Sequence, residues 1–332
     1  MKRIAILLLS IVSLQLAAFG QGPLTPPGPP APTFKTLQQI EPRTPISALP
    51  VTISTSGSYY LTTNLTCVAC SNNLNGISLN VNNVTIDLNG FELVGVAGSQ
   101  YGVEAVNVAR DISIKNGTIR NWGVGGVVLN GNRFASINNV SFIDNVTYGF
   151  FGASGCVVQD CRADGNLYGI TVYDESIVTH CIVQNSSLIG IAAAEGSTVK
   201  DCVARFNGTG FRGTDSVTIE GCSATSNTVD GIAVYNTCRV VGNTCNRNGS
   251  AGIRLSFAGS HIENNTVVSN NPTAALFGGG IYNSTGGNLI IRNALSGNGL
   301  ANYNFTANNR YGTIITTTNE ITSTNPWANF VY

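Results

Sequence analysis

A glycine that precedes a short strand-like run recurs at a nearly constant interval, and this period constrains the fold more than any other feature. The glycines stand 20 or 21 residues apart, at Gly169, Gly190, Gly210, Gly231 and Gly252. Each unit between them holds three runs of three or four residues with alternating apolar positions, too short for helices. One such unit cannot bury its own inward face, so neighbouring copies must stack on one another.

Stacked units of three short strands, one strand spacing of about 4.8 Å apart, predict an all-β parallel β-helix. The pattern resembles the right-handed, single-stranded coil of the pectate-lyase-like superfamily, and parallel strands favour right-handed crossovers. Ten leading glycines occur from Gly76 to Gly280. We therefore expect about ten rungs of 20–28 residues over residues 76–300.

Asparagine and cysteine form two further columns at the same period. Asparagine tolerates the left-handed backbone, and its amide can bond the copies above and below, so we expect an asparagine ladder at one corner. Its predicted members are Asn145, Asn166, Asn185, Asn207, Asn227, Asn248 and Asn270. The cysteine column contains Cys161, Cys181, Cys202 and Cys222, with Val140, Thr244 and Thr266 assigned to the same slot. Valine and threonine are small substitutes, so we interpret these cysteines as core residues.

The chain has nine cysteines, so at least one is unpaired unless it bonds another chain. Cys67 and Cys70 are the best disulfide candidates, Cys156 with Cys161 is a second pair, and neighbours in the cysteine column could also bond between rungs. A zinc site at the first pair is disfavoured, because it needs further ligands and the two histidines lie far along the chain.

The N-terminus has the pattern of a secretion signal over residues 1–20. Lys2 and Arg3 precede an apolar stretch, and Ala18 and Gly20 offer small residues for cleavage. An uncleaved anchor is the alternative. No later run reaches 18 apolar residues, so we expect a secreted or cell-surface protein with no membrane span after cleavage.

Three other segments lie outside the regular repeats. Residues 21–35 are rich in proline and predict an extended spacer. Residues 36–75 are expected to cap the first rung, with a hairpin or bent edge pair around Gly57. Residues 301–332 lose the period, and we expect them to cap the other end, with Trp327 and Phe330 covering the final rung.

Three short words carry a closer resemblance. They are Gln-Ile-Glu-Pro-Arg-Thr-Pro-Ile at 39–46, Gly-Ser-Tyr-Tyr-Leu at 57–61 and Asn-Val-Thr-Ile-Asp-Leu-Asn-Gly at 83–90. On these words the chain is similar, over residues 36–332, to an exported bacterial family of parallel β-helix repeat proteins. The resemblance implies the fold and export, but no particular activity.

Composition excludes several functional classes. The chain carries 17 basic and 17 acidic residues, so no basic surplus points to nucleic acid or to an anionic membrane surface. No P-loop, dinucleotide fingerprint or nucleophile elbow is present in the sequence.

A carboxylate column suggests either a cation site or a solvated corner. Asp174, Glu195 and Asp215 stand five residues after successive leading glycines. Oxygen ligands suit Ca²⁺, which would relieve the repulsion between them. Arg212 faces outward on the same rung as Asp215, so the two are candidate catalytic residues of a calcium-dependent polysaccharide lyase. The simpler interpretation is that these are solvated corner residues.

A histidine stands between two carboxylates in another column, formed by Asp160, His180 and Asp201. We favour a stacked, structural histidine over acid–base chemistry. The polygalacturonase relatives of this fold use a Gly-His-Gly word, which is absent here.

Tyrosines form the remaining columns of interest. Tyr148 and Tyr168 share one column, and Tyr173 and Tyr235 share another. Aromatic faces can stack on sugar rings, although packing at rung corners is the alternative. The main prediction is a non-catalytic adhesion, glycan-binding or structural module whose partner is a polysaccharide or cell-surface glycan. The alternative is a polysaccharide lyase or glycoside hydrolase that acts on an acidic polysaccharide, and fold resemblance alone is a weak argument for it.

Overall fold

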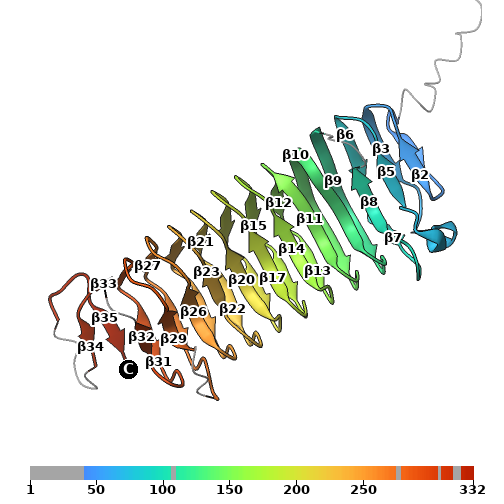
Figure 1. Ribbon diagram of the computed structural model, residues 1–332. Coiled ribbons are helices and arrows are strands. Elements are labelled where there is room, and N and C mark those ends of the chain that lie inside the picture. Colours follow the sequence, from blue (N-terminus) through green and yellow to red (C-terminus); the bar gives the residue numbers. More distant parts are fainter. Residues whose placement is uncertain (1–40, 106–109, 274–277, 306–307, 317–322) are drawn as a thin grey trace, which may run out of the picture. The chain divides into compact units, whose positions relative to one another are not determined.

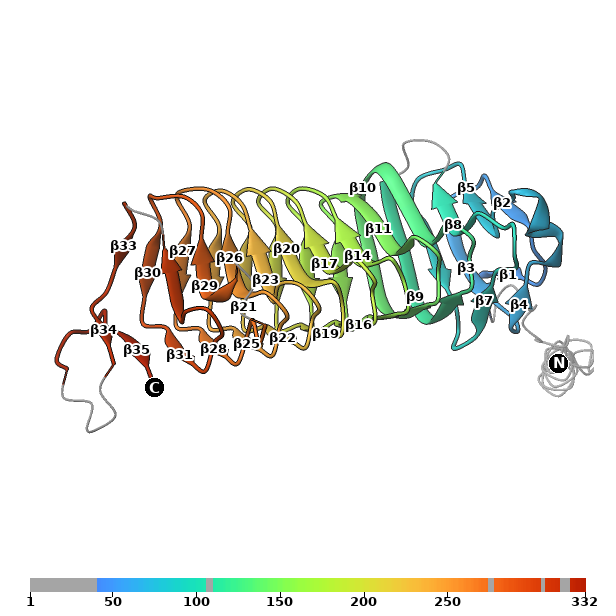
Figure 2. The same cartoon turned by 60° about the horizontal axis from the view of Figure 1, so that its bottom comes forward.

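The computed structural model describes residues 41–105, 110–273, 278–305, 308–316 and 323–332. The predicted signal, the proline-rich spacer and residues 36–40 of the predicted N-terminal cap lie outside these residues. The unit Arg43–Tyr332 is a coil in which successive short strands wind around one apolar core (Figures 1 and 2). The all-β parallel β-helix is confirmed. No helix among these described ranges is long and apolar enough to cross a membrane.

The strands form three parallel columns, which two long strands join around the corners: β9 (Arg110–Arg120) and β10 (Gly125–Ile143). Besides part of β10, the first column contains β2 (Val51–Ile53), β5 (Ile77–Leu79), β8 (Tyr101–Ala105), β11 (Tyr148–Ser154), β14 (Tyr168–Val172), β17 (Ile189–Ala193), β20 (Thr209–Gly213), β23 (Ile232–Val234), β26 (Ala251–Leu255), β29 (Gly279–Asn283) and β32 (Tyr303–Phe305).

The second and third columns follow the first in each turn. Besides parts of β9 and β10, the second contains β1 (Thr44–Ile46), β3 (Gly57–Leu61), β6 (Val84–Asp87), β12 (Val157–Gln159), β15 (Ile177–Thr179), β18 (Thr198–Lys200), β21 (Thr218–Glu220), β24 (Arg239–Val241), β27 (His261–Glu263), β30 (Leu289–Ile291) and β33 (Arg310–Tyr311). The third contains β4 (Leu65–Thr66), β7 (Glu92–Val94), β13 (Arg162–Asp164), β16 (Ile182–Gln184), β19 (Val203–Arg205), β22 (Ser223–Thr225), β25 (Thr244–Asn246), β28 (Thr266–Val268), β31 (Ala294–Ser296), β34 (Ile314–Ile315) and β35 (Asn329–Val331).

The register confirms that residues about 21 positions apart lie on top of one another. Val178 pairs with Val199, and Val199 pairs with Ile219. The first column extends one strand beyond the ten expected rungs at each end, at β2 and at β32. The coil is therefore longer than the leading glycines alone indicate.

The leading glycines are required because two backbones and an asparagine amide meet there. A Cβ atom on Gly210 would lie 2.6 Å from the carbonyl oxygen of Gly231 and 2.8 Å from Nδ2 of Asn227. These separations are shorter than any ordinary carbon contact, so a side chain would force the rungs apart. The glycine column and the asparagine column therefore depend on each other.

The asparagine ladder exists, with one member in a different place from the prediction. From Asn207 to Asn270 each backbone N–H donates to Oδ1 of the next asparagine, at 3.0 Å for Asn207 to Asn227. In the rung before Asn207 the buried slot holds Ser186, whose backbone N–H bonds Asn207 Oδ1 at 2.9 Å. Asn185 is instead the exposed left-handed residue before the slot, with φ of 54°.

The cysteine column also continues differently from the prediction. Cys161, Cys181, Cys202 and Cys222 are buried and unpaired, as expected of small core residues. Val140 does occupy their slot one rung earlier, since Ser141 pairs with Arg162. Thr244 and Thr266 do not, because they pair with the strand residue after the cysteine. Buried asparagines fill the slot instead, at Asn243, Asn265, Asn293 and Asn329.

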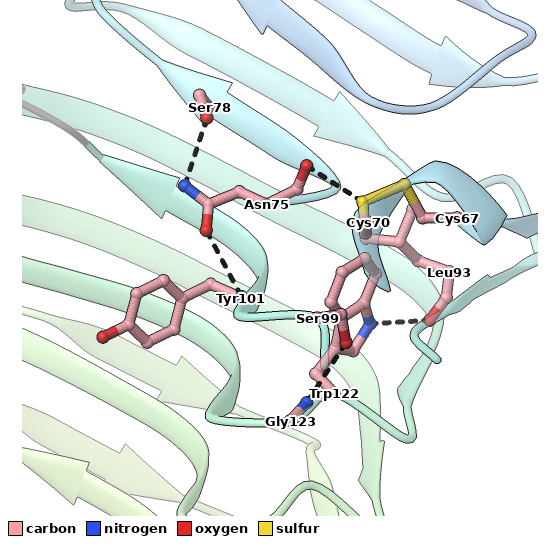
Figure 3. The surroundings of a disulfide bond; sticks show 9 residues. All are labelled: Cys67, Cys70, Asn75, Ser78, Leu93, Ser99, Tyr101, Trp122 and Gly123. Atoms are coloured by element: carbon pink, nitrogen blue, oxygen red, sulfur yellow. Dashed lines mark hydrogen bonds between the residues drawn. A yellow bond between two sulfur atoms is a disulfide. The ribbon is translucent and has the colours of Figure 1, made fainter. Parts of the chain in front are cut away.

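At the N-terminal end the predicted hairpin is wrong. β2 pairs with β5, and β3 pairs with β1 and β6, all in parallel, so these strands already belong to the coil. The 3-10 helix Val68–Asn72 follows β4 and carries the Cys67–Cys70 disulfide (Figure 3). The predicted Cys156–Cys161 bond is not formed, because both thiols are free.

A buried tryptophan fills the core near this disulfide. Trp122 is fully buried, and its Nε1–H donates to the carbonyl of Leu93 at 3.2 Å (Figure 3). At the opposite end, β35 pairs with β31 and β34. Trp327 is 51% exposed, and its ring lies 4.5 Å from the guanidinium of Arg292. The cover of the final rung stays a prediction.

Candidate functional site

The outward side chains of the first column form the surface of interest. In each strand alternate residues point inward, as Ile170, Ile191 and Phe211 do, and the residues that follow them point out. Because the strands pair in register, one outward position of each rung falls into a single row. In chain order this row contains Phe151, Thr171, Ala192, Arg212, Ala233, Arg254 and Tyr282.

Four aromatic rings gather at the N-terminal end of this row. Tyr148 stacks on Tyr168 with ring centroids 5.2 Å apart, and Tyr148 lies 4.7 Å from Phe151. Phe151 meets Tyr173 edge to face at 5.4 Å. The rings border a groove of about 240 Å³, which also has Ile189, Thr171, Val172, Ala192, Ala193, Ala194, Thr214 and Arg212 in its lining. We refer to it as the aromatic groove.

The surroundings of Tyr148 favour its neutral phenol. Partial burial raises the pKa of Tyr148, and the neighbouring phenols of Tyr168, Tyr173 and Tyr101 raise it further. A neutral phenol both donates and accepts hydrogen bonds. The groove therefore presents ring faces together with hydroxyl groups, which is the combination that a sugar ring requires.

Arg212 stands where the aromatic groove meets a second groove. Its Nη2 donates to the hydroxyl of Tyr235 at 2.8 Å, and its guanidinium lies 5.3 Å from that ring. The second groove, which we call the arginine groove, shares Arg212 and Ile189 with the first. Its lining also contains Ser187, Leu188, Gly208, Thr209, Thr228, Val229, Asp230, Ala233, Tyr235, Arg254 and Ser256.

A buried ion pair holds the far wall of the arginine groove. Arg254 donates from Nε and Nη2 to the two carboxylate oxygens of Asp230, at 2.6 and 3.0 Å. Asp230 is 4% exposed and also accepts the backbone N–H of Ala251 at 3.0 Å. Two parallel hydrogen bonds of this kind orient a guanidinium strongly.

Of the four tyrosines predicted to bind carbohydrate, three lie together. Tyr148, Tyr168 and Tyr173 line the aromatic groove, and Tyr235 lines the arginine groove. Sequence reasoning missed Phe151 and Asp230. Phe151 lies at an outward position of its strand, between positions where neighbouring rungs carry tyrosines, so the repeat could have identified it as a further exposed ring. Asp230 has the sequence pattern of an ordinary turn residue. Its ion pair joins it to Arg254 on the next rung, and the sequence does not indicate this contact.

The three predicted metal ligands stack in order at the turn after β14, β17 and β20. The residue after each of the first two bonds the next ligand's carbonyl, since Glu175 N–H donates to Glu195 O and Gly196 N–H donates to Asp215 O. Asp174 and Glu195 are exposed, and Asp215 Oδ1 accepts the side-chain amide of Asn236 at 2.8 Å. In the described part of the chain, no three acidic, histidine or cysteine side chains converge as metal ligands. The calcium site stays a prediction, tested by a Ca²⁺-dependent rise in melting temperature.

The candidate catalytic pair is divided between two places. Arg212 lines both grooves, whereas Asp215 lies beyond the strand end and is absent from the lining of either one. Neither Asp, Glu nor His occurs among the described residues that line the aromatic groove. The geometry therefore offers Arg212 for binding, and it places Asp215 at the turn.

His180 lies between two carboxylates, as its column predicts. Nδ1 is 4.0 Å from Asp160 and Nε2 is 3.9 Å from Asp201. All three residues adopt a left-handed backbone at an exposed corner. Ion pairs at exposed positions contribute little to stability, and this corner borders neither groove.

Comparison with known proteins agrees with the fold. The model of the right handed beta helix region matches residues 52–207 and 191–300. The A-module of the mannuronan C-5 epimerase AlgE6 of Azotobacter vinelandii has a TM-score of 0.64 at 17% identity, covering 83% of this chain and 89% of that one. The AlgE4 A-module of the same organism has a TM-score of 0.62 at 16% identity, covering 83% and 86%.

At these identities the likeness to the two solved structures shows the fold alone. No curated protein matches the chain by sequence. The family model, in contrast, spans well over half of the residues. The chain therefore belongs to the right-handed β-helix family.

Proposed function

We propose that the protein is a non-catalytic module that binds a saccharide chain along the outer face of the first strand column. The observation that carries this proposal is the aromatic groove, where four rings and several small side chains line one continuous surface. Low charge, with 34 charged residues in 332, fits a surface that binds mainly through ring faces and hydrogen bonds.

Sugar rings bind such a surface for a simple reason. Burying the C–H face of a pyranose against Tyr148 or Tyr168 removes apolar area from water, while its hydroxyl groups keep hydrogen bonds to phenols and solvent. Ala192 and Ala194 keep the floor of the groove low. An open, shallow groove favours a chain that lies along it over a small molecule that needs enclosure.

The enzymatic alternative is a polysaccharide lyase or glycoside hydrolase. Such enzymes need a positioned acid or base close to the bound sugar. The described lining of the aromatic groove offers phenols and Arg212, and no carboxylate. Absorbance of unsaturated sugar products measures lyase activity directly, and release of such products from a uronate polymer would replace the binding proposal with the catalytic one.

Export completes the proposed role, because polysaccharides of this kind lie outside the cytoplasm. Lys2, Arg3 and the apolar stretch that follows are the basis for a secreted or cell-surface location. N-terminal sequencing of the mature protein should find Gln21 first. A mature protein that begins at Met1 would overturn the location.

Affinity electrophoresis against a panel of soluble polysaccharides tests the binding. The panel includes mannuronan, because the two similar structures are modules of mannuronan epimerases. Tyr168→Ala should weaken binding by about tenfold, which corresponds to the loss of one stacked ring. Tyr311→Ala is the matched control, because Tyr311 is 54% exposed and lies outside both grooves. Retention of no polymer at all would refute the proposal.

A further inference from the structure

We propose that the arginine groove binds one carboxylate of the saccharide chain, over Ala233 and between Arg212 and Arg254. The ligand is then an acidic polysaccharide, with uronate residues or an equivalent carboxylate substituent. This inference rests on the proposed function, because the same chain would occupy the aromatic groove. It depends on Arg212, Ala233 and Arg254 and not on the aromatic rings, so the two proposals can fail independently.

The three residues lie on successive rungs. Arg212 pairs in register with Ala233, and Ala233 pairs with Arg254. Neighbouring strands are about 4.8 Å apart, so the two arginines flank the alanine at one strand spacing on either side. Because alanine is the smallest side chain with a Cβ, the space above it stays open between the two longer side chains.

Both guanidinium groups lean toward the rung of Ala233. Arg212 reaches forward to the hydroxyl of Tyr235, two residues after the alanine. Arg254 reaches back to the carboxylate of Asp230, three residues before it. The two cations therefore approach the same rung from opposite directions and from opposite ends of the strand.

The charges favour a single anion. Asp230 balances Arg254, whereas Arg212 has no carboxylate partner within salt-bridge distance among the residues that the structure describes. The lining contains these two arginines and one aspartate as its charged side chains, which gives a net charge of +1. One sugar carboxylate would neutralise it.

The site is partly organised before any ligand binds. Arg254 donates from Nε and Nη2 to Asp230, and Nη2 also donates to Oγ of Ser250 at 3.0 Å. Its guanidinium lies 5.4 Å from the ring of Tyr282. The side chain of Arg254 is therefore held on three sides. Groups that are already fixed lose less conformational entropy on binding, which favours affinity.

The distance between the two grooves requires a chain as ligand. Tyr168 lies on the rung of β14, and Ala233 lies three rungs later on β23. Three strand spacings amount to about 14 Å, so one sugar cannot stack on Tyr168 and place its carboxylate over Ala233. Only an oligosaccharide along the coil axis can do both.

The test compares one polymer in two chemical states, a uronan and the same uronan with its carboxyl groups reduced to alcohols. Isothermal titration at low salt should show about tenfold weaker binding after reduction. Arg212→Gln should reduce that difference, because it lowers affinity for the acidic chain more than affinity for the reduced chain. A monosaccharide uronate should show no measurable binding.

A second variant protects the test from misfolding. Ala233→Glu places a carboxylate between the two arginines without removing the Arg254–Asp230 pair. It should abolish binding of the acidic chain while the melting temperature stays the same or rises. Thr244→Glu is the control, since Thr244 is an exposed residue on the third column and this change adds equal charge.

The outcomes separate the two proposals. Equal affinity for the acidic and reduced chains, with no effect of Arg212→Gln, would overturn the carboxylate site while the aromatic groove still binds. Loss of binding in Thr244→Glu as severe as in Ala233→Glu would also overturn it, because general charge repulsion would then explain the result. Absence of binding to every chain would remove both proposals.

Discussion

One corner of the coil is built from thiols in its middle rungs and from amides in its later rungs. Between the second and third columns, Cys161, Cys181, Cys202 and Cys222 fill the slot. From Asn243 onward, asparagine fills it. The backbone takes the same path in both regions, so the comparison isolates the side chain.

The two regions satisfy their backbone differently. Each cysteine Sγ–H has its shorter contact within its own rung, to the carbonyl two residues earlier, as Cys202 does to Lys200 at 3.2 Å. The contact of Cys202 Sγ with the preceding rung, at the carbonyl of Val178, is longer at 3.6 Å. The asparagines connect rungs: the backbone N–H of Asn243 donates to Oδ1 of Asn265 at 2.9 Å, and Asn265 Nδ2 donates to Val240 O at 2.9 Å. The thiol region is therefore held by packing, and the amide region by hydrogen bonds across rungs.

The largest expected effect is on the amide side. Asn265→Ala removes an acceptor for the backbone N–H and the side-chain amide of Asn243, and leaves the carbonyl of Val240 without its donor. The free energy of unfolding should fall by about 2–4 kcal/mol, because buried polar groups lose their partners. Urea titration measures it, with the exposed Asn72→Ala as control. A loss equal to that of the control would contradict the ladder.

A smaller loss is expected on the thiol side. Cys202→Ala removes one sulfur from a packed core, and the backbone N–H of Cys181 loses a weak N–H···S hydrogen bond of 3.4 Å. We expect a loss of about 1–2 kcal/mol, from the cavity and from this weak bond. If urea titration finds Cys202→Ala as costly as Asn265→Ala, the distinction between the two regions fails.

The free energy of unfolding should rise when the interruption of the asparagine ladder is repaired. Ser186 occupies an asparagine slot at the neighbouring corner, and its buried Oγ has no hydrogen-bond partner among the described residues. Ser186→Asn restores an amide between Asn166 and Asn207, so the protein should gain about 1 kcal/mol. Calorimetry should show a higher melting temperature, and a lower one would mean that the slot is too narrow here.

The smallest expected signal is thiol reactivity of the folded protein. Burial raises the pKa of Cys156 to about 11, and burial also raises the pKa of Cys245. A raised pKa keeps the sulfur protonated at pH 8, and only the thiolate reacts with iodoacetamide. All seven free cysteines are buried, so mass spectrometry should find none of them labelled in the folded protein and all of them labelled after unfolding without reductant. Rapid labelling of any folded thiol would contradict its burial.

Much of the fold follows from the sequence, because the coil repeats locally. The spacing of Gly190 and Gly210 predicts the rung, and alternation predicts that Phe211 faces in and Arg212 faces out. The slot assignments of Asn185 and Thr244 are wrong by one residue each. Asn185 is the left-handed residue directly before its slot, and Thr244 is the strand residue directly after its slot. The period alone does not separate neighbouring positions of this kind.

The candidate site was only partly predictable, for a related reason. Tyrosine rows are visible as a period, so Tyr148 and Tyr168 could be paired from the sequence. The contacts of the arginine groove depend on the directions in which long side chains extend. Asp215 is close to Arg212 in sequence, yet Arg212 bonds Tyr235 on the next rung, and Arg254 bonds Asp230 on the rung before.

The sequence by itself determined that this chain coils into parallel rungs and which side chains point out, because both follow from a short period and from the alternation of strand residues. Only the tertiary structure decided which outward side chains meet. Contacts between rungs depend on the exact register and on the rotamers of long side chains. The repeat pattern specifies neither of them. The pairing of Arg254 with buried Asp230, which leaves Arg212 as the uncompensated cation of the groove, is the clearest case.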